Sequence, residues 1–286
     1  MRCFFVSDLH GHRHRYEQLF AAIARERPSA VFLGGDLLPG AHRSAAGKFP
    51  AVTDFIEDYL AAHLGRLAEE LGEDYPRVFL IPGNDDPRRE GESLLDPRHT
   101  DLWTYLHGRC AALNEFTVFG YSYVPPTPFQ LKDWERYDVS RYVEPGCISP
   151  EEGRRTVPVA ASETRYATIN EDLAALTADH DLANAIMLFH APPYDTALDR
   201  AALDGMKIDH APLDVHVGSI AIRRFILQRQ PRITLHGHIH ESAAITGSWT
   251  DKLGESHCFS AAHRGHELAL VRFDPAAPDN ATRELL

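Results

Sequence analysis

Five short apolar runs in this sequence share one arrangement: each is rich in β-forming residues and ends in a turn whose side chains can bind metal ions. The runs are Phe4–Val6, Val31–Leu33, Val78–Ile81, Ile186–Phe189 and Ile233–Leu235. The turns that follow them are Ser7-Asp8-Leu9-His10, Gly34-Gly35-Asp36, Pro82-Gly83-Asn84-Asp85-Asp86, His190 and His236-Gly237-His238-Ile239-His240. Short apolar runs bounded by Gly and Pro are typical of strands buried on both faces. We therefore expect five buried strands with polar side chains at their carboxyl ends.

Helical patterns lie between these runs. Apolar residues recur at helical spacing in Tyr16–Ile23, in Phe55–Leu67 and in Ser219–Arg229. Alternating strands and helices predict an α/β fold, in which ligands gather at the carboxyl ends of the strands. All five polar turns lie at such ends, so we expect them to converge on one site.

The remainder of the chain has weaker patterns. The stretch from about residue 88 to 181 is less regular, and we expect a long excursion there with a helix near Glu163–Leu176. Leu268–Phe273 is predicted to form a closing strand before a loose C-terminal tail. The sequence contains no internal repeat or low-complexity linker.

Charge and cysteine content restrict the class of protein. Lys and Arg number 29 and Asp and Glu 41, which gives a formal net charge of −12 and argues against a broad attraction to nucleic acid or anionic membranes. The 4 cysteines are scattered without a CxxC pair and are expected to be reduced thiols. The first apolar run is too short for a signal peptide, and no later stretch could span a bilayer. We expect a soluble, cytoplasmic protein.

Two pairs of candidate ligands are spaced two residues apart. Asp8 and His10 would leave the same face of an extended chain and could bind one ion together, as could His238 and His240. For Asp8 and His10 alone, a surface turn is the simpler interpretation. A chance histidine-rich loop is the alternative for His238 and His240, and we favour it less.

Asp36, Asn84 and His190 complete the candidate set. Asp36 follows Gly34-Gly35 and could bridge two cations, although an Asp there could also cap a helix or a turn. Asn84 offers an amide oxygen in what is otherwise a plain turn. His190 ends an apolar run, where a core histidine is the alternative.

The combination is more informative than its parts. Two Asp, one Asn and four His follow five predicted strands. This mixture of oxygen and imidazole donors suits manganese, iron or zinc better than Mg²⁺ or Ca²⁺. Seven ligands are too many for one tetrahedral zinc and suit two ions that share Asp36.

The ordered set of these motifs resembles the calcineurin-like metallophosphoesterase superfamily. The resemblance implies a four-layer α/β sandwich of two mixed β-sheets flanked by helices, with a dinuclear metal site at the carboxyl ends of the strands. It implies that Asp8, His10 and His240 hold the first metal and Asn84, His190 and His238 the second, with Asp36 as the bridge and a water shared by the metals as the nucleophile. Further stretches are similar to uncharacterised bacterial and archaeal phosphoesterases: Val124–Phe129, Lys132–Glu135, His216–Ser219 and His240–Ser242.

The sequence departs from the family pattern at two positions. Pro39 stands where a second Asp is common, which affects a contact behind the metals. Asp85 stands where many members have a His that assists the leaving group. Beside two cations a carboxylate accepts hydrogen bonds rather than donating a proton, so the donor would be water, His216 or absent.

These observations predict a metallophosphoesterase domain over residues 1–286, with the excursion at about 88–181 over its active-site face. We expect hydrolysis of a small-molecule or nucleotide phosphate ester, a phosphodiester rather than a monoester, with two divalent or trivalent ions, manganese or iron before zinc. Asp85 and His216 are the candidate catalytic side chains. The alternatives are a nucleotide pyrophosphatase, a non-catalytic interaction module on the same scaffold, and a metal-storage or sensor protein.

Overall fold

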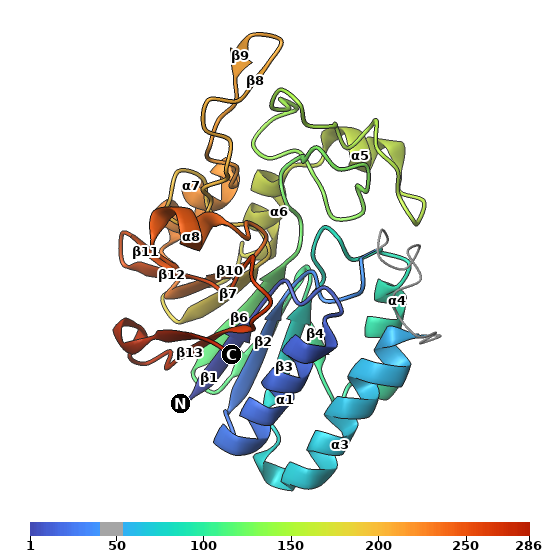
Figure 1. The fold of residues 1–286 in the computed structure, drawn as a ribbon, viewed down its shortest axis with the longest axis vertical. Helices are drawn as coiled ribbons and strands as arrows, with labels where there is room; N and C mark the ends of the chain where they lie inside the picture. Colours follow the sequence, from blue (N-terminus) through green and yellow to red (C-terminus); the bar gives the residue numbers. More distant parts are fainter. Residues whose placement is uncertain (41–53) are drawn as a thin grey trace.

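The computed structural model describes residues 1–40 and 54–286 and contains two six-stranded sheets that face each other, with helices on their outer faces (Figure 1). The first sheet has the order β14-β13-β1-β2-β3-β4. Its strands are β1 (Cys3–Val6), β2 (Ala30–Gly34), β3 (Arg77–Ile81), β4 (Thr104–Tyr105), β13 (Ala269–Phe273) and β14 (Thr282–Leu285). β1 to β4 run parallel to one another. β13 is antiparallel to β1, and β14 is antiparallel to β13.

The second sheet has the order β11-β12-β10-β7-β6-β5. Its strands are β5 (Arg109–Leu113), β6 (Phe116–Tyr121), β7 (Ala185–Phe189), β10 (Ile233–His236), β11 (Thr250–Leu253) and β12 (Ser256–Ser260). The four inner strands are parallel, and the edge strands β5 and β11 are antiparallel to them. Because β1 to β3 are parallel, and β7 and β10 also, the carboxyl ends in each sheet meet at one edge.

Helices cover the outside of both sheets. α1 (Arg13–Glu26), a π-helical turn (Ile56–Ala61) and α3 (Ala62–Leu71) pack on the first sheet, and α6 (Ile169–Leu176) and α7 (Ile220–Arg229) on the second. The shorter elements are α4 (Gly91–Leu94), α5 (Ala161–Tyr166), α8 (Ser242–Thr246), 3-10 turns at Gly72–Asp74, Pro97–His99 and Pro278–Asn280, and a hairpin of β8 (Lys207–Ile208) and β9 (Ala211–Pro212). None of the helices in the described ranges combines the length and the apolar character needed to cross a membrane.

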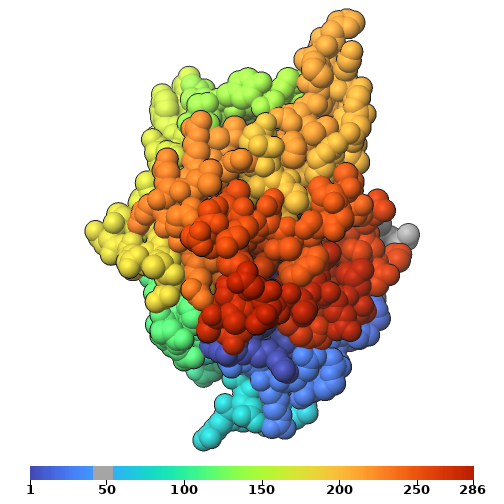
Figure 2. Space-filling model, turned by 90° about the vertical axis from the view of Figure 1, so that its left-hand side faces the viewer, coloured from blue at the N-terminus to red at the C-terminus, as the bar shows by residue number. Residues whose placement is uncertain are grey.

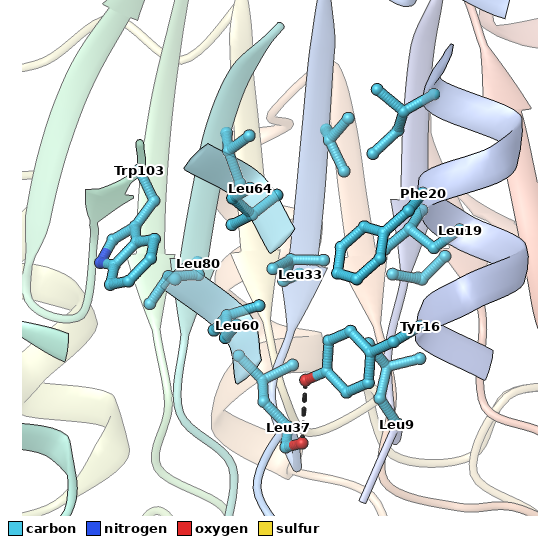
Figure 3. Packing of buried hydrophobic residues seen from close by; sticks show 14 of the residues in the cluster. Leu9, Tyr16, Leu19, Phe20, Leu33, Leu37, Leu60, Leu64, Leu80 and Trp103 are labelled. Carbon is cyan, nitrogen blue, oxygen red and sulfur yellow. Dashed lines mark hydrogen bonds between the residues drawn. The ribbon is translucent and has the colours of Figure 1, made fainter. Parts of the chain in front are cut away.

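The central strands are apolar on both faces because each face is covered. In β1, Phe4 packs towards the helices, whereas Phe5 packs between the sheets with Phe32 of β2. Figure 3 shows the helix side, where Tyr16 and Phe20 of α1 lie over the first sheet. The Tyr16 hydroxyl also donates a hydrogen bond to the Leu37 carbonyl (2.9 Å), which ties α1 to the loop after β2. This burial explains the continuous apolar runs, because a strand open to water on one face would alternate with polar residues.

The predicted fold class is confirmed: two mixed sheets flanked by helices, with the five predicted strands at β1, β2, β3, β7 and β10. Three expectations were incomplete. The stretch 88–181 contains β4, β5 and β6, which belong to the sheets, so its irregular part is confined to about 122–160. The helix expected at Glu163–Leu176 is two helices, because the backbone is extended at Ala167 and Thr168 between them. Thr168 caps the second helix by accepting a hydrogen bond from the Glu171 amide (3.1 Å). The C-terminal tail forms β14 against β13.

The irregular part and the β8–β9 hairpin extend beyond the carboxyl ends of the strands, at the top of Figure 1. Figure 2 shows the hairpin (orange) standing out above the C-terminal strands (red). The structure therefore places its least regular segments at the end of the molecule where the polar turns also lie.

Candidate metal centre

Hydrogen bonds between backbones hold the polar turns side by side. The amides of Asp8 and His10 donate to the carbonyls of Gly35 (2.9 Å) and Asp36 (2.7 Å), so the loops after β1 and β2 run together. In the second sheet, the Gly237 amide donates to the His190 carbonyl (2.9 Å), which joins the loops after β10 and β7.

Four of the candidate ligands have left-handed backbone conformations. The φ angles are 57° at Asp8, 48° at His10, 52° at Asp36 and 74° at His238. The expectation that Asp8 and His10 share one face of an extended chain is therefore wrong, and so is the same argument for His238: β1 ends at Val6 and β10 at His236, and the ligands lie in the turns beyond. The turns, not the pleat of a strand, bring the paired side chains together.

Asp8, His10, Asp36 and His240 form one compact group. One potential ligand atom from each lies within 4.8 Å of all the others. Nε2 of His240 is 3.2 Å from Nε2 of His10 and 3.3 Å from Oδ1 of Asp8. Two imidazole nitrogens and carboxylate oxygens that converge in this way match the donor set of one transition-metal ion.

Asn84, His190 and His238 form a second group next to the first. His190 is fully buried, and its Nε2 lies 3.0 Å from Oδ1 of Asn84. Its Nδ1 lies 2.8 Å from the Gly34 carbonyl oxygen, an acceptor that fixes the proton on Nδ1 and leaves Nε2 free for a metal. The His238 ring centroid is 5.2 Å from that of His190, and the His238 amide donates to Oδ1 of Asp8 (3.0 Å).

Asp36 lies between the two groups. Its Oδ2 is 3.8 Å from Nε2 of His10 and 3.4 Å from Nε2 of His190, while its Oδ1 accepts a hydrogen bond from the Asp85 amide (2.7 Å). Two glycines make this crowding possible. A Cβ on Gly35 would meet Nδ1 of His190 at 2.5 Å, and one on Gly83 would collide with the Asp36 carboxylate.

The electrostatics of the centre favour ionised carboxylates. Burial opposes the charge on Asp8, but the hydrogen bond from His240 and the nearby imidazoles outweigh it and hold the pKa of Asp8 well below its usual range. In the same way, burial is outweighed by His190 and His10 at Asp36, whose pKa is lowered to about 2. Asp85 and the other carboxylates overcome burial at His10 and raise its pKa to about 9. Buried anions with imidazoles around them suit a bound cation, which takes the place of the imidazole protons.

The two candidate catalytic residues have different surroundings. Asp85 lies at the edge of the centre, where its Oδ2 is 3.4 Å from Nδ1 of His10. His216 instead contacts Asp199, with Nδ1 2.8 Å from a carboxylate oxygen that is completely buried. In the part of the chain that the structure describes, its recorded partners include none of the candidate ligands. A catalytic role for His216 stays a prediction.

Sequence reasoning overlooked two supporting residues. Asp86 accepts hydrogen bonds from the amides of Gly83 (2.8 Å), Leu37 (3.0 Å) and Leu38 (2.7 Å), and so fixes the loop that contains Asp36 and Pro39. The acidic run after Asn84 was the available signal. Arg15 is buried and donates to the carbonyl oxygen of Asp8 itself. The signal for Arg15 was its position four residues before Leu19, which places a charged residue in line with the apolar face of the helix predicted at Tyr16–Ile23.

The first histidine of His236-Gly237-His238-Ile239-His240 is structural. Nδ1 of His236 lies 2.9 Å from the Ala191 carbonyl oxygen, Nε2 lies 2.7 Å from the Thr234 hydroxyl, and the ring stacks on Phe189. Both ring nitrogens are already used, so His236 is a core histidine.

Comparisons with known proteins concern the family and the fold. Residues 1–242 match the family model described as calcineurin-like phosphoesterase. An uncharacterised protein of Methanocaldococcus jannaschii is 38% identical over 78 residues, which cover 27% of this chain and only 30% of that protein. A solved structure from Thermus thermophilus has a TM-score of 0.54 at 17% identity and covers 99% of this chain and 98% of its own. A dimetal phosphatase from Danio rerio has a TM-score of 0.52 at 13% identity, with 95% and 91% covered. At these identities the structural likeness concerns the fold alone.

Proposed function

Because the chain belongs to the calcineurin-like phosphoesterase family, we propose that it hydrolyses a phosphate ester with two metal ions bound at the centre described above. Membership of this family implies a phosphoric ester hydrolase that uses divalent metals. The proposal goes further in naming the ligands, the number of ions and the substrate class.

The ligand assignment rests on the position of Asp36. Its Oδ2 faces Nε2 of His10 on one side (3.8 Å) and Nε2 of His190 on the other (3.4 Å). A carboxylate oxygen that faces one imidazole on each side is placed to bridge two ions. We assign Asp8, His10 and His240 to the first ion, Asn84, His190 and His238 to the second, and Asp36 to both.

The donor set guides the choice of metal. Four imidazoles, two carboxylates and one amide favour manganese, iron or zinc over ions that prefer oxygen alone. When bound, such a pair of ions supplies Lewis-acid polarisation of phosphoryl oxygens and a lowered pKa for water. The contribution of the chain is to fix these donors in a buried site, where Asp8 is 0% and Asp36 3% exposed.

The residue after Asn84 bears on the choice of substrate. Asp85 has a carboxylate whose Oδ2 lies 3.4 Å from Nδ1 of His10. A carboxylate beside cations accepts hydrogen bonds and is a poor donor of a proton to a leaving group. General acid catalysis raises rates by roughly 10² to 10⁴-fold. Without a general acid, esters whose leaving group needs no proton lose the least rate. We therefore favour aryl esters over plain alkyl esters, and we propose phosphodiesters as the substrate class. A pyrophosphate bond of a nucleotide falls under the same reasoning and is the second candidate.

The proposed domain organisation follows from the same site. We propose that residues 1–286 act as one metallophosphoesterase domain. The irregular segment of about 122–160 and the β8–β9 hairpin would then shape the substrate side of the centre, since both extend beyond the carboxyl ends of the strands.

The test combines metal analysis with an ester panel. Purified protein loaded with Mn²⁺ should contain close to two ions per chain and hydrolyse bis(p-nitrophenyl) phosphate faster than p-nitrophenyl phosphate or a plain alkyl monoester. Asp36→Asn should lose activity on every ester, while Asp101→Asn, a change at an exposed position, should behave as wild type. Two bound ions with no hydrolysis of any ester or pyrophosphate would instead favour a binding module or a metal-storage protein.

A further inference from the structure

The imidazole of His10 has a different partner at each of its two nitrogens. Nε2 faces into the centre, 3.2 Å from Nε2 of His240 and 3.8 Å from Oδ2 of Asp36. Nδ1 points away from the centre and lies 3.4 Å from Oδ2 of Asp85. A neutral imidazole carries one proton, so an acceptor at Nδ1 leaves the lone pair of Nε2 for a metal.

We propose that Asp85 is a positioning residue that orients His10 through its carboxylate and Asp36 through its backbone amide. The proposal rests on the two-metal function above and assigns a role at a position where the family commonly has a different residue. In this role Asp85 does not touch the substrate. It fixes the direction of one imidazole ligand and of the carboxylate shared by both ions.

The backbone of Asp85 supports the second half of this role. Its amide donates to Oδ1 of Asp36 at 2.7 Å, so only Oδ2 of that carboxylate is left to face His10 and His190. One residue therefore contacts a ligand of the first ion and the ligand proposed for both. Gly40 leaves the space that this side chain occupies, because a Cβ at Gly40 would collide with Oδ2 of Asp85.

His190 provides an internal comparison. Its Nδ1 also faces an oxygen acceptor, the carbonyl of Gly34 at 2.8 Å, while its Nε2 faces Asn84 and Asp36. Both imidazoles thus face an oxygen through Nδ1, at hydrogen-bond distance for His190 and at ion-pair distance for His10, and both turn Nε2 inward. The difference is that the acceptor for His10 is a side chain and can be changed without altering the backbone. Oxygen acceptors behind metal-binding histidines typically change metal affinity or activity by about 10 to 100-fold when they are removed.

The first experiment measures metal affinity. Competition with a chelator of known strength should show that Asp85→Ala binds one of its two Mn²⁺ ions about 10 to 100-fold more weakly, with Asp85→Asn in between because its amide oxygen can still accept. Asp195→Asn is the matched control: this carboxylate lies 3.8 Å from Nε2 of His216 but touches no candidate ligand. Equal affinities in wild type, Asp85→Ala and Asp195→Asn would overturn the proposal.

The second experiment separates positioning from catalysis. Activity of Asp85→Ala should return to the wild-type kcat once Mn²⁺ is raised until both ions are bound. A kcat that stays low with both ions bound would assign Asp85 to the reaction itself and contradict the proposal. Circular dichroism of the metal-free variants confirms that they fold.

The third readout is independent of turnover. Nitrogen-15 spectra of the diamagnetic zinc-loaded protein should show His10 protonated at Nδ1 and metal-bound at Nε2. The reverse arrangement would exclude Asp85 as the acceptor. Wild-type protein that binds no metal would refute the proposed function, whereas wild type with two ions and an unaffected Asp85→Ala would refute only the role of Asp85.

Discussion

Backbone strain at the scale of single residues is concentrated at the candidate metal centre. Ten non-glycine residues in the described ranges have positive φ angles, and four of them are Asp8, His10, Asp36 and His238. Such conformations cost of order 1–3 kcal/mol each and persist where the surroundings enforce them. At Asp8 the enforcing contacts include the hydrogen bond that its amide donates to the Gly35 carbonyl and the hydrogen bond from Arg15 to the Asp8 carbonyl oxygen. Because the fold enforces these conformations at the candidate ligands, their geometry is set before a metal binds.

Asn84 offers a mild way to test the second metal position. Asn84→Ala removes the Oδ1 atom that lies 3.0 Å from Nε2 of His190 and leaves Asp8, His10 and His240 intact. We expect elemental analysis after dialysis to fall from about two Mn²⁺ per chain to about one. The exposed Asn170→Ala is the matched control and should keep both ions. Full occupancy in Asn84→Ala would show that the amide is not a ligand.

His107, which lies outside the metal centre, should make the stability of the fold depend on pH. Burial, with the charges of Arg88, Arg136 and Arg109, lowers the pKa of His107 to about 3, and its Nδ1 accepts a hydrogen bond from the Ser122 amide (3.0 Å). In the unfolded chain a histidine has a pKa of about 6.5. Above that pH both states are neutral. Between 6.5 and 3 the unfolded state alone gains a proton, so stability falls as pH falls, by at most about 1.4 kcal/mol per pH unit.

The measurement is urea unfolding at pH 7, 6 and 5 in EDTA, which keeps metal binding out of the comparison. His107→Gln retains an acceptor for the Ser122 amide but does not titrate. Its free energy of unfolding should therefore decline less steeply than that of wild type. Parallel curves for the two proteins would show that His107 does not cause the decline.

At the scale of elements, a buried ion pair organises the irregular segment beyond the strands. Lys132 and Glu135 are both 0% exposed, with Nζ and Oε2 2.5 Å apart. Lys132 also donates to the Thr127 carbonyl (2.9 Å), and the Thr127 amide donates to Glu135 (2.7 Å). The pair thus closes a loop within a described segment that forms no strand or helix of its own.

Removing one partner of this pair should be costly. Lys132→Met leaves the Glu135 carboxylate buried without its cation, which typically destabilises a protein by about 3–5 kcal/mol. Adding Glu135→Gln removes the charge and keeps an acceptor for the Thr127 amide, so the double variant should recover most of the loss. Chemical unfolding of the single and double variants measures both effects. A double variant no more stable than Lys132→Met would contradict this account.

Burial explains which elements could be predicted from the sequence. β1, β2, β3, β7 and β10 are buried on both faces and appear as unbroken apolar runs. β5 and β14 are edge strands with mostly exposed residues, and they depend on pairing with β6 and β13, which lies outside any local pattern. The break between α5 and α6 depends on the extended backbone at Ala167 and Thr168 and on the Thr168 cap, neither of which the apolar spacing reveals.

At the scale of the whole molecule, the candidate centre joins the two sheets. Asp8 and His10, Asp36 and Asn84 follow strands of the first sheet, whereas His190, His238 and His240 follow strands of the second. Parallel strands made the meeting of ligands within each sheet predictable. Contacts between the two sheets, such as the hydrogen bond from His190 to the Gly34 carbonyl, depend on how the sheets pack. They could be anticipated only through the family resemblance. The contacts of Asp85 with His10 and of His216 with Asp199 could not be predicted from the sequence, because they depend on how distant loops fold together.

Metal ions held by ligands from both sheets should act as cross-links on the entire fold. A ligand that binds only the folded state at 100 times its Kd stabilises a protein by about 2.7 kcal/mol, and two ions contribute up to about twice that. Adding Mn²⁺ to metal-free protein should therefore raise Tm by several degrees, and by more as the concentration increases. Asp36→Asn should lose most of this increase, and Mg²⁺ at equal ionic strength should reproduce little of it. Scanning calorimetry in EDTA and at increasing Mn²⁺ concentrations measures this change in Tm. An unchanged Tm would mean that the seven side chains do not hold ions across the interface between the sheets.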